Sequence, residues 1–175
     1  MQSLRTYLEK LHDIYPDQLA TVKEPVDWRY EVTAYVAEME RRDDNPALLF
    51  EGIKDHEMPL LINLFGNEDR ILLSLGDTSH IRGSRLDFYN AWNRLINKEV
   101  PPTYASKGPV KDIRLRGGDV DLTSLPIPKF YEQDGGRYVT AGLLAARNPE
   151  NPEEVNLTYA RMHLKGKDRF GVSLH

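Results

Sequence analysis

Residues 46–66 read PALLFEGIKDHEMPLLINLFG. The stretch holds two short apolar runs, 47–50 and 60–65, each bounded by Pro or Gly, with a tight polar connection at 51–56 between them. Apolar runs of this length with such boundaries are typical of buried strands. The stretch therefore predicts two strands in the amino-terminal region.

Helical patterns surround these two runs. Apolar residues recur at i, i+3, i+4 and i+7 from Leu4 to Leu11, and again from Val32 to Met39 after a possible cap at Asp27. A short helix ending near Gly76 and a longer helix over 85–98 are expected to follow. The residues expected to face inward from the longer helix are Phe88, Trp92, Leu95 and Ile96. Helices that flank a few strands predict an α/β layer.

The composition changes at Pro101 and Pro102, because prolines cannot continue a helix. We place a boundary near residue 115, which divides the chain into an amino-terminal α/β domain over 1–115 and a β-rich domain over 116–175. Strands are expected at 138–147, 155–165 and 169–174, with a hairpin turn between the last two. The fold class is therefore α/β, or more broadly α+β.

Charge and composition exclude several classes of protein. The 175 residues contain 23 Lys and Arg against 27 Asp and Glu, well interspersed, so no basic stripe for nucleic acid is present. No Cys is available for a disulfide or a thiolate, and no phosphate-binding loop, GxGxxG or HExxH motif occurs. The apolar runs are far too short for a membrane span, and no signal peptide is visible, so a cytoplasmic protein is expected.

The terminal hairpin holds the candidate site. If Lys165 pairs with Asp168, His175 falls opposite Thr158 and diagonal to Asn156, so an imidazole and an amide oxygen could share a manganese or magnesium ion. A polar face on an exposed strand remains the alternative. Arg161 has two interpretations as well: a strand arginine with a salt-bridge partner, or a planar cation for a carboxylate or phosphate.

Five segments carry a family resemblance. They are 46–54, 58–66, 119–128, 134–140 and 156–162. In this order they resemble the amino-terminal third of UbiD-like decarboxylases. The resemblance implies a non-oxidative, reversible decarboxylase of aromatic or α,β-unsaturated carboxylic acids. Its cofactors would be prenylated FMN, Mn2+ and K+, with the flavin supplied by a flavin prenyltransferase. The implied fold is an amino-terminal α/β domain, a split β-barrel that holds the flavin, and a carboxy-terminal domain for homo-oligomer formation.

The resemblance also implies roles for individual residues. Asn156 and His175 match metal ligands at the flavin phosphate, and Arg161 matches the arginine of a catalytic Glu-Arg-Glu network. The matching cofactor contacts are Thr158, Tyr159, Ala160, Arg161, Ser173 and Leu174. The two catalytic glutamates and the third metal ligand of the family would lie beyond His175, so we expect this chain alone to be inactive. The alternatives are a flavin-binding or assembly module without catalysis, and a plain interaction domain.

One geometric conflict follows from the spacing. Asn156 and Arg161 are five residues apart, so a regular strand would point their side chains to opposite faces. We therefore predict irregular backbone between them, as a bulge, a break in the ladder or a strand end. A β-bulge between Leu157 and Ala160 is the first choice, because bulges are common beside active sites.

Overall fold

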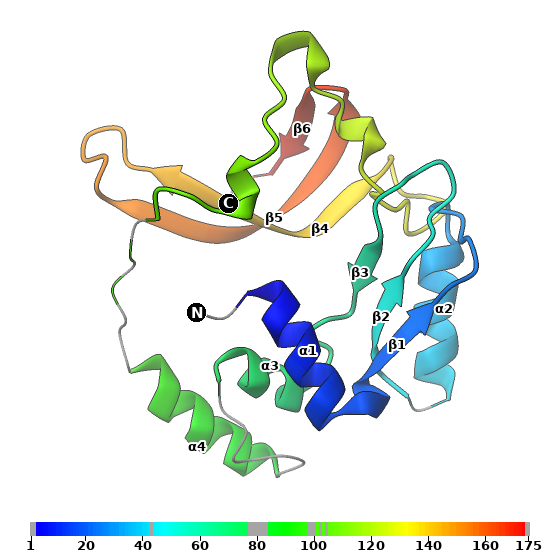
Figure 1. Cartoon of the computed structure of the whole chain (residues 1–175), viewed down its shortest axis with the longest axis vertical. Helices are drawn as coiled ribbons and strands as arrows, with labels where there is room; N and C mark the ends of the chain where they lie inside the picture. Colours follow the sequence, from blue (N-terminus) through cyan, green and yellow to red (C-terminus); the bar gives the residue numbers. More distant parts are fainter. Residues whose placement is uncertain are drawn as a thin grey trace. The chain divides into compact units, whose positions relative to one another are not determined.

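The fold was analysed in a computed structural model that describes residues 3–42, 44–76, 84–97, 101, 103 and 105–173. The chain divides into two compact units (Figure 1). The first unit consists of the chain up to Glu24 together with Val36–Glu51 and Leu60–Arg114. The second consists of Pro25–Tyr35, Gly52–Pro59 and the chain from Leu115 onward. Two stretches of the amino-terminal region thus belong to the second unit.

The first unit contains a three-stranded sheet in the order β1-β2-β3. Its strands are β1 (Leu19–Val22), β2 (Ala47–Phe50) and β3 (Leu60–Ile62). β2 pairs in parallel with β1 and antiparallel with β3. Both predicted strands are confirmed, although β3 stops at Ile62, where Asn63 takes a positive φ of 56° that ends the extended backbone. β1 was not predicted, since Thr21 interrupts its apolar residues, so that no continuous apolar run marks it.

The helices are α1 (Leu4–Ile14), α2 (Glu31–Arg41), α3 (Glu68–Ser74) and α4 (Arg85–Ile96). Short 3-10 helices span Pro16–Gln18, Pro109–Lys111, Gly117–Asp119 and Leu122–Ser124. The expected helix cap at Asp27 is wrong: α2 begins at Glu31, Tyr30 before it has a φ of 67°, and the Asp27 carboxylate accepts from the amide of Arg29. Asp27 therefore closes a turn and does not cap the helix.

The inward face of α4 differs from the prediction. Ala91 is fully buried and Phe88 and Leu95 are half-buried, whereas Trp92 and Ile96 are 36% and 51% exposed. The spacing of large apolar residues identified the helix but not the face that packs. The core of the first unit gathers Tyr7, Leu11, Tyr15, Ala47 and Leu73.

A buried arginine, Arg70, forms hydrogen bonds to several segments of the first unit. The guanidinium of Arg70 is fully buried and donates to the backbone oxygens of Leu64, Asn45 and Asn63, and to the side chain of Gln18. The hydroxyl of Tyr7 donates to the carbonyl of Arg70 over 3.0 Å. Burial raises the pKa of Tyr7 to about 12 and lowers the pKa of Arg70.

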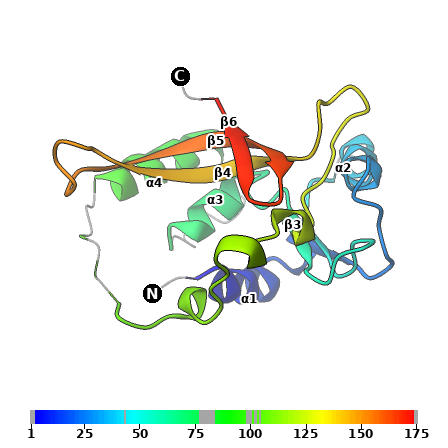
Figure 2. The ribbon, with the colours of Figure 1, turned by 90° about the horizontal axis from the view of Figure 1, so that it is seen from above.

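The second unit contains an antiparallel three-stranded sheet in the order β4-β5-β6. Its strands are β4 (Tyr138–Arg147), β5 (Val155–Gly166) and β6 (Arg169–Val172), close to the predicted ranges. β6 is much shorter than β5 and lies beside only part of it (Figure 2). The mixed α/β fold class is therefore confirmed, with two small sheets.

Two predicted details of this sheet are wrong. The β5–β6 turn pairs Gly166 with Arg169, not Lys165 with Asp168, because Lys165 is an extra residue in the ladder. The predicted bulge in β5 is also absent. The irregularity lies in β4: Val139 pairs with Met162 and Gly142 with Ala160, so Thr140 and Ala141 face the single residue Arg161.

Within the described residues, no helix is long and apolar enough to cross a membrane.

Candidate functional site

β5 carries five of the predicted site residues. Asn156, Thr158, Tyr159, Ala160 and Arg161 all lie in its first seven positions, and Ser173 directly follows β6. Leu174 and His175 lie outside the described residues, so the predicted pairing of His175 with Asn156 is not described either. The site can therefore be built from β5 and the elements around it.

The side chains of β5 alternate between two faces. Its ladder with β4 is regular from Val155 to Ala160, so Asn156 and Thr158 share one face and Tyr159 the other. Arg161 belongs to the face of Tyr159 and His163. Its guanidinium lies 3.9 Å from the ring centroid of Tyr138, on which the imidazole of His163 also packs, with ring centroids 4.3 Å apart. The structure thus does not bring Asn156 and Arg161 together on one face.

One edge of β5 is open beside these residues. β6 pairs only with Met162–Gly166, and β4 pairs with the other edge from Val155 to His163. Among the described residues, no strand pairs with the outer edge of 155–161. Backbone N–H and C=O groups along an unpaired edge can bind a ligand, as they bind an added strand.

Arg161 forms a salt bridge with Asp134. Its Nη2 lies 3.2 Å from Oδ1 of Asp134, and its side chain is 55% exposed while that of Asp134 is 16% exposed. The other oxygen of Asp134 accepts from the amide of Tyr131 over 3.1 Å. Arg161 therefore has the salt-bridge partner that the plainer interpretation required, and remains accessible to a second anion.

His163 packs against Tyr138 beside Arg161. Burial, and then the nearby cations of Lys165 and Arg161, lower the pKa of its imidazole, although a backbone hydrogen bond at Gly135 acts in the opposite direction. The neutral form of the imidazole is thereby favoured, and the cations near it are those of Arg161 and Lys165.

A hollow of about 460 Å³ lies at the β4–β5 hairpin. It is lined by Ala146, Arg147, Asn148, Pro149, Glu154, Val155 and Asn156. Hydrogen bonds from Asn148 and Asn151 lower the pKa of Glu154. No cluster of three His, Asp or Glu side chains with metal-binding geometry occurs in the described parts of the chain. Asn156 is thus the single predicted metal ligand that the described structure places.

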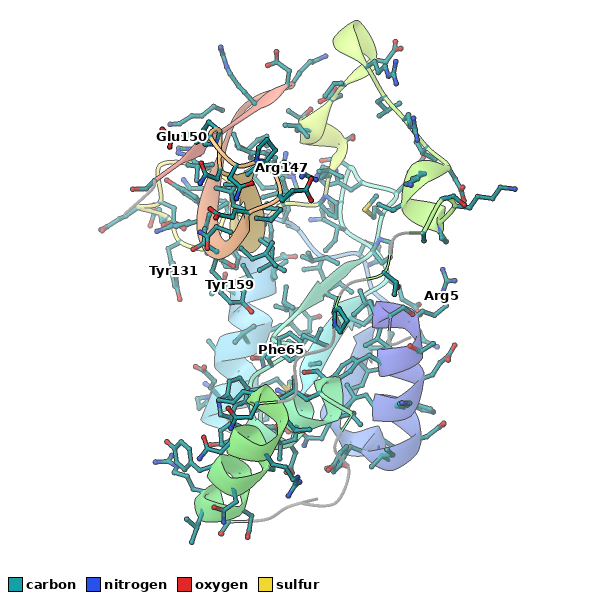
Figure 3. All side chains as sticks on the ribbon, turned by 90° about the vertical axis from the view of Figure 1, so that its left-hand side faces the viewer. Arg5, Phe65, Tyr131, Arg147, Glu150 and Tyr159 are labelled. Carbon is teal, nitrogen blue, oxygen red and sulfur yellow. The ribbon has the colours of Figure 1, made fainter. Side chains whose placement is uncertain are left out.

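The apolar side chains around Arg161 are exposed. Tyr159 is 73% exposed, and Leu143, which pairs with it across the ladder, is also exposed. Figure 3 shows the side chains of Tyr159 and of Tyr131 extending from the ribbon. A flat apolar surface beside a guanidinium suits a planar ligand that carries a negative charge.

Sequence reasoning missed the residues that hold Arg161. Asp134 and the two glycines after it appeared only within a segment of the resemblance. Gly136 leaves room for the imidazole, since a Cβ there would lie 2.5 Å from Nε2 of His163. The pattern DGGRY at 134–138 was the available signal, but nothing local connects it to Arg161.

Two models of known protein families match this chain. The amino-terminal domain model of 3-octaprenyl-4-hydroxybenzoate carboxy-lyase, UbiD, matches residues 15–86, and its Rift-related domain model matches residues 103–175. The chain belongs to the UbiD family. The two matches together account for most of the chain, in the order that the resemblance predicted.

Solved structures agree over the whole chain. The vanillic acid decarboxylase of Sedimentibacter hydroxybenzoicus, in open form, is 30% identical, with a TM-score of 0.86 over 98% of this chain and 37% of that one. An evolved dimeric form of the UbiD-class enzyme HmfF from Pelotomaculum thermopropionicum, in complex with prFMN, is 26% identical, with a TM-score of 0.81 over 100% of this chain and 39% of that one.

A third structure shows likeness of fold alone. The 3,4-dihydroxybenzoic acid decarboxylase of Klebsiella pneumoniae is 22% identical, with a TM-score of 0.81 over 100% of this chain and 37% of that one. The chain thus spans less than two-fifths of the length of each of these three proteins.

Proposed function

We propose that this chain is the amino-terminal part of a non-oxidative, reversible decarboxylase of aromatic or α,β-unsaturated carboxylic acids, and that it binds prenylated FMN. Family membership and the likeness to a prFMN-bound relative support the cofactor. The observation that carries the assignment of the site is the accessible guanidinium of Arg161 beside the unpaired edge of β5.

The unpaired edge removes the conflict between the two faces. A ligand that lies along an edge meets side chains from both faces of the strand, whereas a ligand on one face meets every second side chain. Asn156 would then reach the phosphate end from one face and Arg161 the ring end from the other. Thr158, Tyr159 and Ala160 lie between them on the same strand, and Ser173 and Leu174 would approach from beyond β6.

The residues present fit such a cofactor in their chemistry. The amide oxygen of Asn156 is a suitable ligand for Mn2+ at a phosphate, and Tyr159 offers an aromatic surface. Prenylated FMN, when bound, supplies the electron sink that makes loss of CO2 feasible. Arg161 would bind the substrate carboxylate with two parallel hydrogen bonds and hold it in one orientation. Proton delivery requires an acid that we place outside these residues, so the chain alone binds cofactor without turnover.

Further expectations belong to the whole protein. We expect K+ beside Mn2+, with His175 as the second protein ligand of Mn2+, a flavin prenyltransferase that supplies the cofactor, assembly as a homo-oligomer and a cytoplasmic location. The substrate is a small aromatic or unsaturated acid. The alternative, a flavin-binding or assembly module without catalysis, shares the cofactor site but requires no carboxylate at Arg161.

Titration of the chain with FMN tests the cofactor site, with flavin absorbance as the signal and with or without Mn2+. We expect binding that Mn2+ strengthens, that Asn156→Ala weakens about tenfold or more, and that Asn93→Ala, on the exposed face of α4, leaves unchanged. Arg161→Ala should alter FMN affinity less than Asn156→Ala. Calorimetry should find weak Mn2+ binding without flavin, because a manganese site wants about six ligands. Tight Mn2+ binding without flavin, or no FMN binding at all, would contradict the proposal.

A further inference from the structure

Asp134 contacts the guanidinium of Arg161 and leaves most of its hydrogen-bond donors free. A guanidinium has five N–H donors in a planar fork, and Asp134 accepts from Nη2 alone. Among the described residues, no other acceptor bonds to the Arg161 guanidinium, and the Tyr138 ring covers one of its faces. A complete edge with two N–H donors therefore remains available to a carboxylate.

Asp134 is fixed independently of Arg161. Its second oxygen accepts from the amide of Tyr131, and its own amide donates to the carbonyl of Tyr131 over 3.1 Å. Gly135 and Gly136 then pass close to Tyr138 and His163, where a Cβ would crowd both rings. The loop thus presents a carboxylate to Arg161 from a preset position.

We propose that Asp134 is an internal carboxylate that occupies the guanidinium of Arg161 until the carboxylate of the acid substrate replaces it. The inference rests on the proposed role of Arg161 as the carboxylate-binding residue. Because the Asp134 carboxylate competes for the guanidinium, a ligand that makes two hydrogen bonds to Arg161 would be favoured over a ligand that makes one.

The relative strength of the two interactions makes the exchange feasible. A single contact of 3.2 Å to a half-exposed guanidinium is weak, whereas a bidentate pair of short, charge-assisted bonds is much stronger. Asp134 keeps its bond to Tyr131 after the exchange, but its charge then faces the incoming anion. Asp134 thus weakens carboxylate binding in two ways: it competes for Arg161, and its charge repels the ligand. Removal of the Asp134 charge should therefore strengthen carboxylate binding.

Benzoate titrations of the chain test this inference by NMR at low ionic strength, with the neutral isostere benzamide as the reference ligand. Asp134→Asn and Asp134→Ser both keep an oxygen for the amide of Tyr131 and remove the charge. Each should bind benzoate about threefold to tenfold more tightly than the unmodified chain. Arg161→Ala should lose benzoate binding, and benzamide binding should not respond to any of these changes.

The matched control is Asp121→Asn. Asp121 pairs with Lys167 over 3.5 Å, so this change also removes one negative charge and frees one cation. We expect benzoate affinity within twofold of the unmodified chain. If Asp121→Asn tightens binding as much as the Asp134 variants do, the gain reflects overall charge, and the inference is wrong.

The remaining outcomes separate the inference from the proposed function. Unchanged or weaker benzoate binding in both Asp134 variants, with binding still dependent on Arg161, would overturn the inference alone. Benzoate binding that does not depend on Arg161 would overturn the carboxylate role in the proposed function as well. The NMR spectra report at the same time whether each variant is folded.

Discussion

The guanidinium of Arg137 donates a hydrogen bond from Nη2 to Nε2 of His56 over 3.1 Å. Because Nε2 accepts, the imidazole carries its proton on Nδ1 and donates it to the carbonyl of Ser124 over 3.0 Å. Arg137 also donates to the carbonyls of Leu125 and Ile127. The bridge joins residues 81 positions apart and explains why 52–59 packs with the second unit.

Replacement of His56 should destabilise the second unit. His56→Ala removes the acceptor for Arg137 and the donor for Ser124, so we expect a loss of about 1–3 kcal/mol in the free energy of unfolding. Urea unfolding followed by tryptophan fluorescence measures it, because Trp28 packs against the guanidiniums of Arg29 and Arg137. His12→Ala, on the exposed side of α1, should change stability by less than about 0.5 kcal/mol. Equal effects of the two variants would show that the bridge contributes nothing.

A methyl group at Gly136 should disturb the packing beside Arg161. In Gly136→Ala the new Cβ would lie 2.5 Å from Nε2 of His163, so the imidazole must leave its position over Tyr138. We expect a loss of about 1–3 kcal/mol in the free energy of unfolding. Gly118→Ala is the control, because a Cβ there meets nothing within 4 Å. Chemical shifts of the His163 ring that stay the same in Gly136→Ala would contradict the prediction.

Alkaline pH should destabilise the first unit through Tyr7. Burial raises the pKa of Tyr7 to about 12, whereas an unfolded tyrosine titrates near 10. Between about pH 10 and pH 12 the unfolded chain loses this proton first, so the free energy of unfolding falls as the pH rises, by about 2–3 kcal/mol in total. Below pH 10 the contribution is constant.

Tyr7→Phe separates this effect from general alkaline denaturation. The variant loses the hydrogen bond to the carbonyl of Arg70, which should cost about 1 kcal/mol at neutral pH, but it should also show a smaller fall between pH 10 and pH 12. Tyr89→Phe, at an exposed position on α4, should keep the full alkaline fall. Identical pH profiles for Tyr7→Phe and the unmodified chain would refute the assignment to Tyr7.

Local patterns predicted the elements better than their pairing. The two apolar runs predicted β2 and β3, and helical spacing predicted α1 and α4. The register of β5 and β6 was missed by one residue because the extra residue, Lys165, depends on the geometry of the turn and not on side-chain pattern. The bulge was expected in β5 and occurs in β4, since a ladder can absorb an extra residue on either strand.

The sequence proposes the residues of a candidate site but not their arrangement. The spacing indicated that a regular strand places Asn156 and Arg161 on opposite faces, as the structure does. The unpaired edge on which our proposal rests depends on how far β6 extends along β5, which spacing does not show. Arg161 and Asp134 are in contact although they lie 27 residues apart in the sequence, and no pattern of apolar or polar residues predicts this contact. Tertiary pairing therefore supplies what the sequence pattern could not.

Hydrogen exchange at the edge of β5 tests the central claim most directly. Backbone amides of 156–161 that do not bond to β4 should exchange with solvent in the free chain and become protected, about tenfold or more, when FMN and Mn2+ are added. The same amides should remain unprotected in Asn156→Ala at the same ligand concentrations. Protection confined to other segments, or no change at 156–161 under conditions where flavin absorbance reports binding, would contradict a cofactor site along this edge.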